Sequence, residues 1–153
     1  MRALEGKRIP YEVLTYPHEM RDAEEIAVHL NVEPDRVFKT LVVLPPESKQ
    51  KALLVMVPAN HQLDLKKLAD VVKTKKLKMA SFREAEQLTG LQVGGISAVA
   101  LLGKPFVVYI DESAGQLDRI IISAGKRGLQ LVVGVKDLIE LTNARVADVS
   151  AIG

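Results

Sequence analysis

Residues 38–57 read Phe-Lys-Thr-Leu-Val-Val-Leu-Pro-Pro-Glu-Ser-Lys-Gln-Lys-Ala-Leu-Leu-Val-Met-Val, and this stretch decides the fold. The apolar, β-branched run at 38–44 is typical of a strand, and the Pro-Pro pair that follows interrupts it. A second apolar run at 52–57 then returns toward the first. We therefore predict an antiparallel pair of strands here.

Helices and strands follow one another irregularly on both sides of this pair. Asp22, Asp64 and Ser81 precede apolar positions at helical spacing and are expected to cap helices. Further strands are expected at 9–16, 77–80, 106–110, 119–123, 129–133 and 144–149, and helices at 22–30, 64–72, 81–89 and 136–141, with a short one opening at Pro34. This order predicts a mixed α/β (α+β) fold with a curled sheet, not a doubly wound parallel one.

Length and composition narrow the class of protein. A chain of 153 residues with 48% hydrophobic and 26% charged residues predicts a single domain over 1–153. There is no cysteine, which excludes disulfides and a cysteine nucleophile. The first residues lack the apolar core of a signal peptide, and the longest uncharged run, 91–103, is too short to span a bilayer. A cytoplasmic protein with no membrane partner is the expectation.

The net charge of +2 hides an uneven distribution of charge along the chain. Residues 19–35 hold six acids against one arginine, whereas residues 64–83 hold seven bases against two acids. The basic cluster could meet a phosphate backbone, which would make binding depend on salt. A solvated helix face explains the same pattern equally well. The candidate tRNA-binding residues within it are Lys66, Lys67, Lys73, Lys75 and Lys76.

The usual catalytic motifs are absent from the sequence. The three histidines show no metal-binding spacing, and there is no nucleophile elbow and no phosphate-binding P-loop. We therefore expect no metal and no cofactor. An enzyme with this sequence would act by positioning its substrate and by backbone donors.

Two glycine loops are candidate sites: Thr89-Gly90-Leu91-Gln92-Val93-Gly94-Gly95-Ile96-Ser97 and Ser123-Ala124-Gly125-Lys126-Arg127-Gly128. Glycine permits positive φ and leaves no Cβ in the way of a ligand, so backbone amides of such loops can bind an anion or a polarised carbonyl. The alternative is that the first loop is only a helix end followed by a tight bend.

Lys39 is a lone lysine inside the apolar strand at 38–44. Alternation along a strand places its side chain on the face of Leu41 and Val43, opposite Phe38. If that face lines a cleft, the ammonium is a point charge for a phosphate or a carbonyl. If that face meets solvent, Lys39 has no such role, and periodicity does not separate the two.

Several stretches occur together in an order that resembles a known family. They are Val37-Phe-Lys-Thr-Leu-Val-Val43, Gln62-Leu-Asp-Leu-Lys-Lys67, Thr89-Gly90 with Val93-Gly-Gly-Ile-Ser97, Ser123-Ala-Gly-Lys-Arg-Gly-Leu129 and Ala144-Arg-Val-Ala-Asp148. The chain resembles the YbaK-type aminoacyl-tRNA deacylases, which are relatives of the editing domain of bacterial prolyl-tRNA synthetases. The resemblance covers nearly the whole chain.

This resemblance implies one mixed α/β domain with a curled, largely antiparallel central sheet or barrel flanked by helices. It also implies hydrolysis of the ester that joins a wrong amino acid, cysteine or alanine, to the tRNA for proline. The implied partner is mischarged tRNA, with prolyl-tRNA synthetase as a possible second partner and no DNA.

The resemblance also assigns roles to individual residues. Lys39 would orient the terminal adenosine, and the amides of Gly94 and Gly95 would hold the aminoacyl carbonyl. The remaining substrate-binding candidates are Tyr16, His18, Ser97, Ser123, Gly125 and Gln130. In the family, the thiol of the substrate or a terminal ribose hydroxyl is thought to assist cleavage.

The chain departs from the family pattern at two positions. Ala98 stands where a proline usually follows the first loop, and Gln130 stands where an acid commonly follows the second. A neutral amide does not hold an ammonium group as a carboxylate does, so the amino acid removed is left open. Two other functions also stay open: a non-catalytic protein that binds tRNA or a nucleotide, and a sensor of a small ligand.

Overall fold

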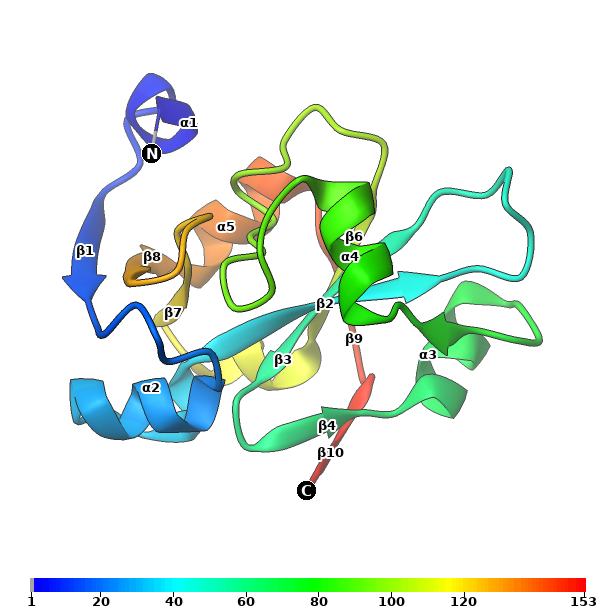
Figure 1. The fold of residues 1–153 in the computed structure, drawn as a ribbon, viewed down its shortest axis with the longest axis horizontal. Helices are drawn as coiled ribbons and strands as arrows, with labels where there is room; N and C mark the ends of the chain where they lie inside the picture. The colour runs from blue at the N-terminus through cyan, green and yellow to red at the C-terminus, as the bar shows by residue number, and fades with distance from the viewer. Residues whose placement is uncertain (1) are drawn as a thin grey trace.

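The computed structural model describes residues 2–153, and its central element is a five-stranded sheet in the order β5-β2-β3-β6-β9 (Figure 1). Strand β2 spans Phe38–Leu44 and pairs antiparallel with β3 at Leu53–Pro58, which confirms the predicted pair. On the far side of β3, strands β6 and β9 run parallel to it. The bounds are Lys78–Met79 for β5, Val107–Asp111 for β6 and Arg145–Ala147 for β9.

Two smaller antiparallel sheets complete the strand structure. One has the order β1-β8-β7, and the other pairs β10 with β4. A bridge between Val37 and Ile121 joins the start of β2 to β7. The bounds are Tyr11–Thr15 (β1), His61–Leu63 (β4), Arg119–Ser123 (β7), Leu129–Gly134 (β8) and Ser150–Ile152 (β10). The fold is the expected mixed α/β type with mostly antiparallel pairing, and residues 2–153 form no closed barrel.

Five short α-helices and two 3₁₀ helices surround the sheets. They are Arg2–Gly6 (α1), Ala23–Leu30 (α2), Leu65–Val72 (α3), Phe82–Thr89 (α4), Val135–Thr142 (α5), Pro34–Arg36 (η1) and Glu112–Gln116 (η2). Asp22, Asp64 and Ser81 accept the expected capping hydrogen bonds, and Ser81 with Glu84 forms a full capping box. Within residues 2–153 no helix has the length and apolar character needed to cross a membrane.

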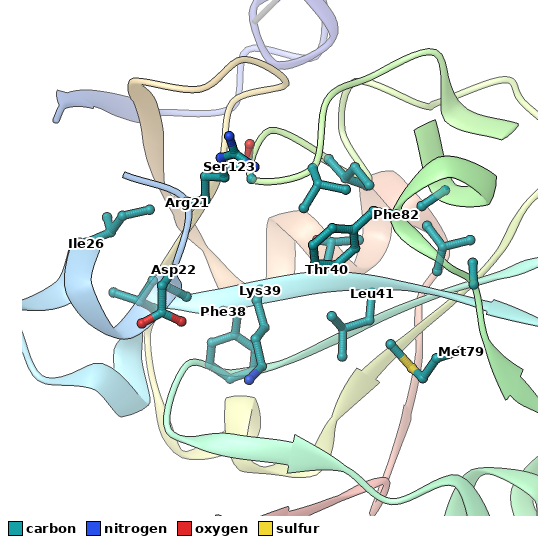
Figure 2. A pocket seen from close by; sticks show the side chains of 18 of the residues that line it. Arg21, Asp22, Ile26, Phe38, Lys39, Thr40, Leu41, Met79, Phe82 and Ser123 are labelled. Atoms are coloured by element: carbon teal, nitrogen blue, oxygen red, sulfur yellow. The ribbon is translucent and has the colours of Figure 1, made fainter. Parts of the chain in front are cut away.

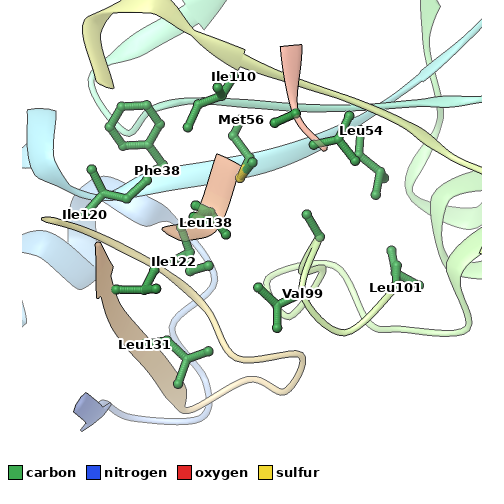
Figure 3. Packing of buried hydrophobic residues seen from close by; sticks show 14 of the residues in the cluster. Phe38, Leu54, Met56, Val99, Leu101, Ile110, Ile120, Ile122, Leu131 and Leu138 are labelled. Atoms are coloured by element: carbon green, nitrogen blue, oxygen red, sulfur yellow. The ribbon is translucent and has the colours of Figure 1, made fainter. Parts of the chain in front are cut away.

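Strand β3 is buried along its whole length because other elements pack on both of its faces. Leu54 and Met56 point into a core that also contains Leu138 of α5 (Figure 3). Val55 and Val57 point the other way, toward Leu68 of α3. A third cluster lies between α2 and the outer face of β7 and β8. Continuous burial explains why residues 53–57 are an uninterrupted apolar run.

The end of the chain differs from the sequence prediction. One strand was expected at 144–149. Strand β9 lies within that range and extends the central sheet, and a further strand, β10, follows it and pairs with β4. The amide of Val149 donates to Asp111 Oδ1 (3.2 Å), which turns the chain out of the central sheet. Helix α1 and strand β4 were not predicted, because both are too short to show a period.

Candidate functional site

A pocket of about 370 Å³ lies beside β2, where segments distant in the sequence meet (Figure 2). Its walls come from the start of α2, from β2, from the β5–α4 segment, from the first glycine loop and from the facing ends of β7 and β8. In Figure 2, Lys39 extends to one side of the β2 ribbon, and Phe82 and Ser123 lie on the other. The pocket therefore wraps around one edge of the strand.

That edge of β2 is only partly paired. Strand β5 pairs with β2 at Val43 and Leu44 alone, and the amide of Ala80 donates to Val42 O (3.0 Å). Because backbone groups of a strand point to alternate edges, the N–H and C=O of Thr40 face the same edge as Val42 O. Thr40 lines the pocket, and no strand within residues 2–153 pairs with it on that side. The pocket floor therefore offers backbone donors and acceptors.

Lys39 lines this pocket and is half-buried. Its Nζ donates a long hydrogen bond to the carbonyl of Ala59 (3.4 Å). Burial lowers the pKa of the Lys39 ammonium from its ordinary value of 10.5, and the carboxylates of Asp22 and Glu24 partly oppose that shift. Lys39 is therefore a partly desolvated cation in a cleft, and the solvated-face alternative does not describe it.

The two adjacent glycines of the first loop have different surroundings. Gly94 lines the pocket and has φ +91°, which favours glycine. Gly95 does not line the pocket, and its amide already donates to Gln92 O (2.8 Å). A Cβ at Gly95 would lie 3.0 Å from the backbone N of Arg127 and 3.1 Å from the carbonyl carbon of Lys126. The absence of a side chain at Gly95 thus lets the second glycine loop pack against the first.

Two side chains hold the glycine loops together. The guanidinium Nε of Arg127 donates to the carbonyl of Val93 at 2.7 Å, from the second loop to the first. The buried Tyr16 donates its hydroxyl to the carbonyl of Gly94 at 3.4 Å, and its amide donates to the carbonyl of Gly128. Tyr16 does not line the pocket, so its contacts position the loops around it.

Ser123 and Gln130 form the inner wall of the pocket. They are directly opposed in the β7–β8 register, and both are buried. Ser123 Oγ accepts a hydrogen bond from the Gly125 amide (3.2 Å). Gln130 Oε1 has no hydrogen-bond partner within residues 2–153. A buried, unpartnered amide is costly, so this wall is suited to a polar ligand group.

Three other predicted substrate-binding residues do not line the pocket. His18 is exposed, near Gly128 of the second loop. Ser97 is buried inside the first loop, where its Oγ accepts from the Ala100 amide (3.4 Å). Gly125 has φ +99°, and a Cβ there would lie 2.9 Å from the Cβ of Ala100. Direct contact of these three with a substrate stays a prediction.

The predicted tRNA-binding lysines do not share one environment. Lys66, Lys75 and Lys76 line a hollow next to Pro45 and Pro46, together with Lys78; we call it the lysine hollow. Lys73 is exposed and lines a neighbouring depression. Lys67 instead pairs with Asp148 at 3.0 Å and donates to the carbonyl of Ser150, on another side of α3. Lys67 is thus already engaged in holding the end of the chain.

Sequence reasoning missed several residues that line the pocket. Asp22 was recognised only as a helix cap and Phe82 only as part of a capped helix, and Arg21, Thr40 and Met79 were not singled out. Nothing in their spacing marks them, because the pocket forms from segments that meet only in the folded chain. Asp22 is the one carboxylate residue in the pocket lining of residues 2–153, and no histidine contributes to that lining. The described residues also contain no cluster of three or more possible metal ligands.

Comparisons with known proteins show the family to which this chain belongs. The family model for the aminoacyl-tRNA editing domain matches residues 17–141. A protein of Enterococcus faecalis named "Putative Cys-tRNA(Pro)/Cys-tRNA(Cys) deacylase EbsC" is 36% identical over 152 residues, which is 98% of this chain and 91% of that protein. The proline–tRNA ligase of Caldicellulosiruptor bescii is 27% identical over 80% of this chain, but the match covers only 21% of the ligase.

A solved structure has the same fold. The protein described as "a putative trans-editing enzyme for prolyl tRNA synthetase" superposes with a TM-score of 0.82 at 28% sequence identity. The match covers 98% of this chain and 93% of that one. The family model, which spans residues 17–141, includes β2 and both glycine loops.

The contact between the glycine loops gives a test by substitution. Gly95→Val should lower the free energy of unfolding by about 1–3 kcal/mol, because the neighbours of the new side chain are backbone atoms that cannot move aside. Gly115→Ala is the matched control: no atom lies within 4 Å of the added Cβ, so we expect a change below about 0.5 kcal/mol. Urea denaturation measures both, and equal midpoints for Gly95→Val and the wild type would contradict the packing role.

Proposed function

The chain belongs to the aminoacyl-tRNA editing domain family, and we propose that it is a trans-editing deacylase that hydrolyses the ester of mischarged proline tRNA, removing cysteine or alanine. The observation that carries this proposal is the convergence of Lys39, Gly94, Ser123 and Gln130 on one pocket. Its volume of about 370 Å³ suits the aminoacyl end of a tRNA. The rest of the tRNA would stay outside.

The geometry suggests how the ester would be held. The Gly94 amide is our candidate donor to the ester carbonyl, since Gly94 lines the pocket and Gly95 uses its amide within the loop. A preorganised backbone donor stabilises the oxyanion that develops as water attacks a carbonyl. The Lys39 ammonium would bind a ribose or phosphate oxygen of the terminal adenosine, with Thr40 beside it on the open edge of β2.

Gln130 is our candidate for contact with the amino acid. Its side-chain amide supplies both a donor and an acceptor, and its unpartnered Oε1 could accept a hydrogen bond from the substrate ammonium. That contact is weaker than a carboxylate would make, so binding would depend more on the fit of the side chain. Ser123, opposite Gln130, would limit the space left for it.

The proton transfers would rely on the substrate. The pocket lining described above offers no histidine, and Asp22 also caps α2 by accepting the amide of Glu25 (3.3 Å). We propose that the cysteine thiol or the ribose hydroxyl of the terminal adenosine assists the attack, as in the family that the sequence resembles. A ribose hydroxyl is present in every charged tRNA, so it would serve the alanine ester as well.

The lysine hollow and Lys73 would bind the phosphate backbone of the acceptor stem. The hollow lies at the β5 end of the pocket, since Lys78 belongs to β5 and the next residue, Met79, lines the pocket. Lys67 is less suited to this role because its ammonium already pairs with Asp148, although the pair is partly exposed. The ligase of C. bescii carries a similar segment inside a longer chain, which favours a common substrate and makes prolyl-tRNA synthetase a candidate partner.

A hydrolysis panel tests the proposed reaction. Proline tRNA charged with cysteine, alanine, serine or proline is incubated with the protein, and the remaining ester is measured over time. We expect the cysteine or alanine ester to be cleaved faster than the proline ester. If no ester is cleaved faster than without protein although tRNA binds, the chain is a non-catalytic tRNA-binding protein. If tRNA does not bind either, a small-ligand sensor is favoured.

Two substitutions distinguish a role of Lys39 in substrate binding from a role in holding the fold together. Lys39→Ala should lower kcat/KM by about tenfold to a hundredfold, because a charge-assisted contact is worth roughly 1.5–3 kcal/mol. Lys39→Met should lower it similarly, since it keeps the volume and loses only the charge. An active, normally folded Lys39→Ala protein would contradict the role in substrate binding.

The stability of Lys39→Met supplies the matching control. The pKa of Lys39 is lower in the folded chain than in the unfolded chain, so the unfolded chain binds the proton more tightly. Stability therefore rises as the pH increases through the folded-state pKa toward 10.5, and the charged lysine costs stability at pH 7. We expect Lys39→Met to be at least as stable as the wild type at pH 7. A clear loss of stability would mean that the ammonium holds the fold together.

The proposed tRNA-binding lysines are tested by measuring how tRNA binding depends on salt concentration. Replacing Lys73, Lys75 and Lys76 together with glutamine should raise the KM for tRNA and reduce the slope of log K against log salt by about 2–3. The preference between cysteine and alanine should not change, because phosphate contacts carry no information about the esterified group. Lys7→Gln with Lys136→Gln, on exposed positions outside the pocket and the lysine hollow, is the control. An unchanged slope in the triple variant would leave these lysines as an ordinary solvated surface.

A further inference from the structure

The side chain of Phe82 lines the pocket and is nevertheless 70% exposed. It is the first residue of α4, and Figure 2 shows it reaching from that helix toward Thr40 on β2. The capping box of Ser81 and Glu84 fixes the backbone at this position. The ring is therefore held at the rim of the pocket with much of its surface open.

Two further apolar side chains of the pocket lie across the edge of β2 from Phe82, on the side of Lys39. Met79, which is 40% exposed, and Leu41 line the same pocket. Single exposed apolar side chains are common and need no explanation, but here an aromatic ring, a thioether and an aliphatic side chain border one cavity. The open face of the Phe82 ring is suited to the flat face of a ring in the ligand.

The charged residues near Phe82 indicate which class of ligand this part of the pocket would bind. Lys75, Lys76 and Lys78 lie directly before Met79 in the chain and line the lysine hollow. No acidic residue occurs between Asp70 and Glu84, so this segment of the chain is positively charged, while Asp22 contributes a carboxylate to the pocket lining. Positive charge beside an aromatic ring is the combination that binds single-stranded nucleic acid, whose phosphates meet the lysines and whose bases stack on the ring.

We propose that Phe82 is the stacking platform for the terminal adenine base of the tRNA. This inference rests on the proposed function for its ligand, and it adds a subsite that recognises the base and not the ester. An aminoacyl group inside the pocket places the attached adenosine at the mouth, where the ring of Phe82 lies. Stacking tolerates any base because every base has a flat face, so this contact contributes affinity and not sequence preference.

The test is a binding cycle with uncharged tRNA, which does not depend on turnover. The Kd values of wild type and Phe82→Ala are measured for proline tRNA and for the same tRNA without its terminal adenosine. Phe82→Ala should weaken binding of the complete tRNA by about fivefold to a hundredfold. It should leave binding of the shortened tRNA unchanged, because the base that it contacts is already missing.

Two more variants of Phe82 and a control sharpen the result. Phe82→Trp should keep the affinity for complete tRNA, and Phe82→Leu, which keeps apolar surface without a flat ring, should behave like Phe82→Ala. Leu88→Ala changes a residue of the same helix that is 49% exposed and does not line the pocket, and it should have no effect on either Kd. An equal effect of Phe82→Ala on both tRNAs, or no effect on either, overturns the proposal. Failure of the hydrolysis panel alone leaves this binding result standing.

Discussion

The burial of β3 on both faces is the constraint on which the site depends. One face of this strand packs against residues of β7, β8 and α5 and the other against Leu68 of α3, so neither face is open to a ligand. Its two edges are occupied by β2 and β6. The nearest backbone that a ligand can reach is therefore the outer edge of β2, and the pocket lies along that edge.

The walls of the pocket depend in turn on how the two glycine loops meet. Gly95 allows the loops to approach, and Arg127 and Tyr16 join them through the carbonyls of Val93 and Gly94. These contacts fix the position of Gly94 relative to the inner wall at Ser123 and Gln130. Many residues of the conspicuous glycine motifs therefore hold the two loops together, and a smaller set of residues lines the cavity.

Local signals account for the parts of the fold that were predicted correctly. Strand 38–44 and the caps at Asp22, Asp64 and Ser81 depend on neighbours within a few residues, which the sequence displays directly. Strand β10 was missed because the turn that precedes it depends on Asp111, 38 residues away from Val149 in the chain. At the site, Lys39, Gly94, Ser123 and Gln130 line the pocket, and their roles toward a substrate stay predictions. The roles of Gly95 and Lys67 could not be predicted, because their partners are distant in the chain.

The partly paired edge of β2 also affects how copies of this chain behave toward one another. An exposed strand edge can template pairing with a strand of another molecule, which is a route to aggregation. Here the unpaired part is short, since it lies between the bridge at Val37 and the pairing at Val43, and it is recessed in a pocket bordered by the first glycine loop and Phe82. A small ligand can enter that recess, but a second strand cannot lie flat along it. The same walls that shape the cavity thus protect the protein from self-association through this edge.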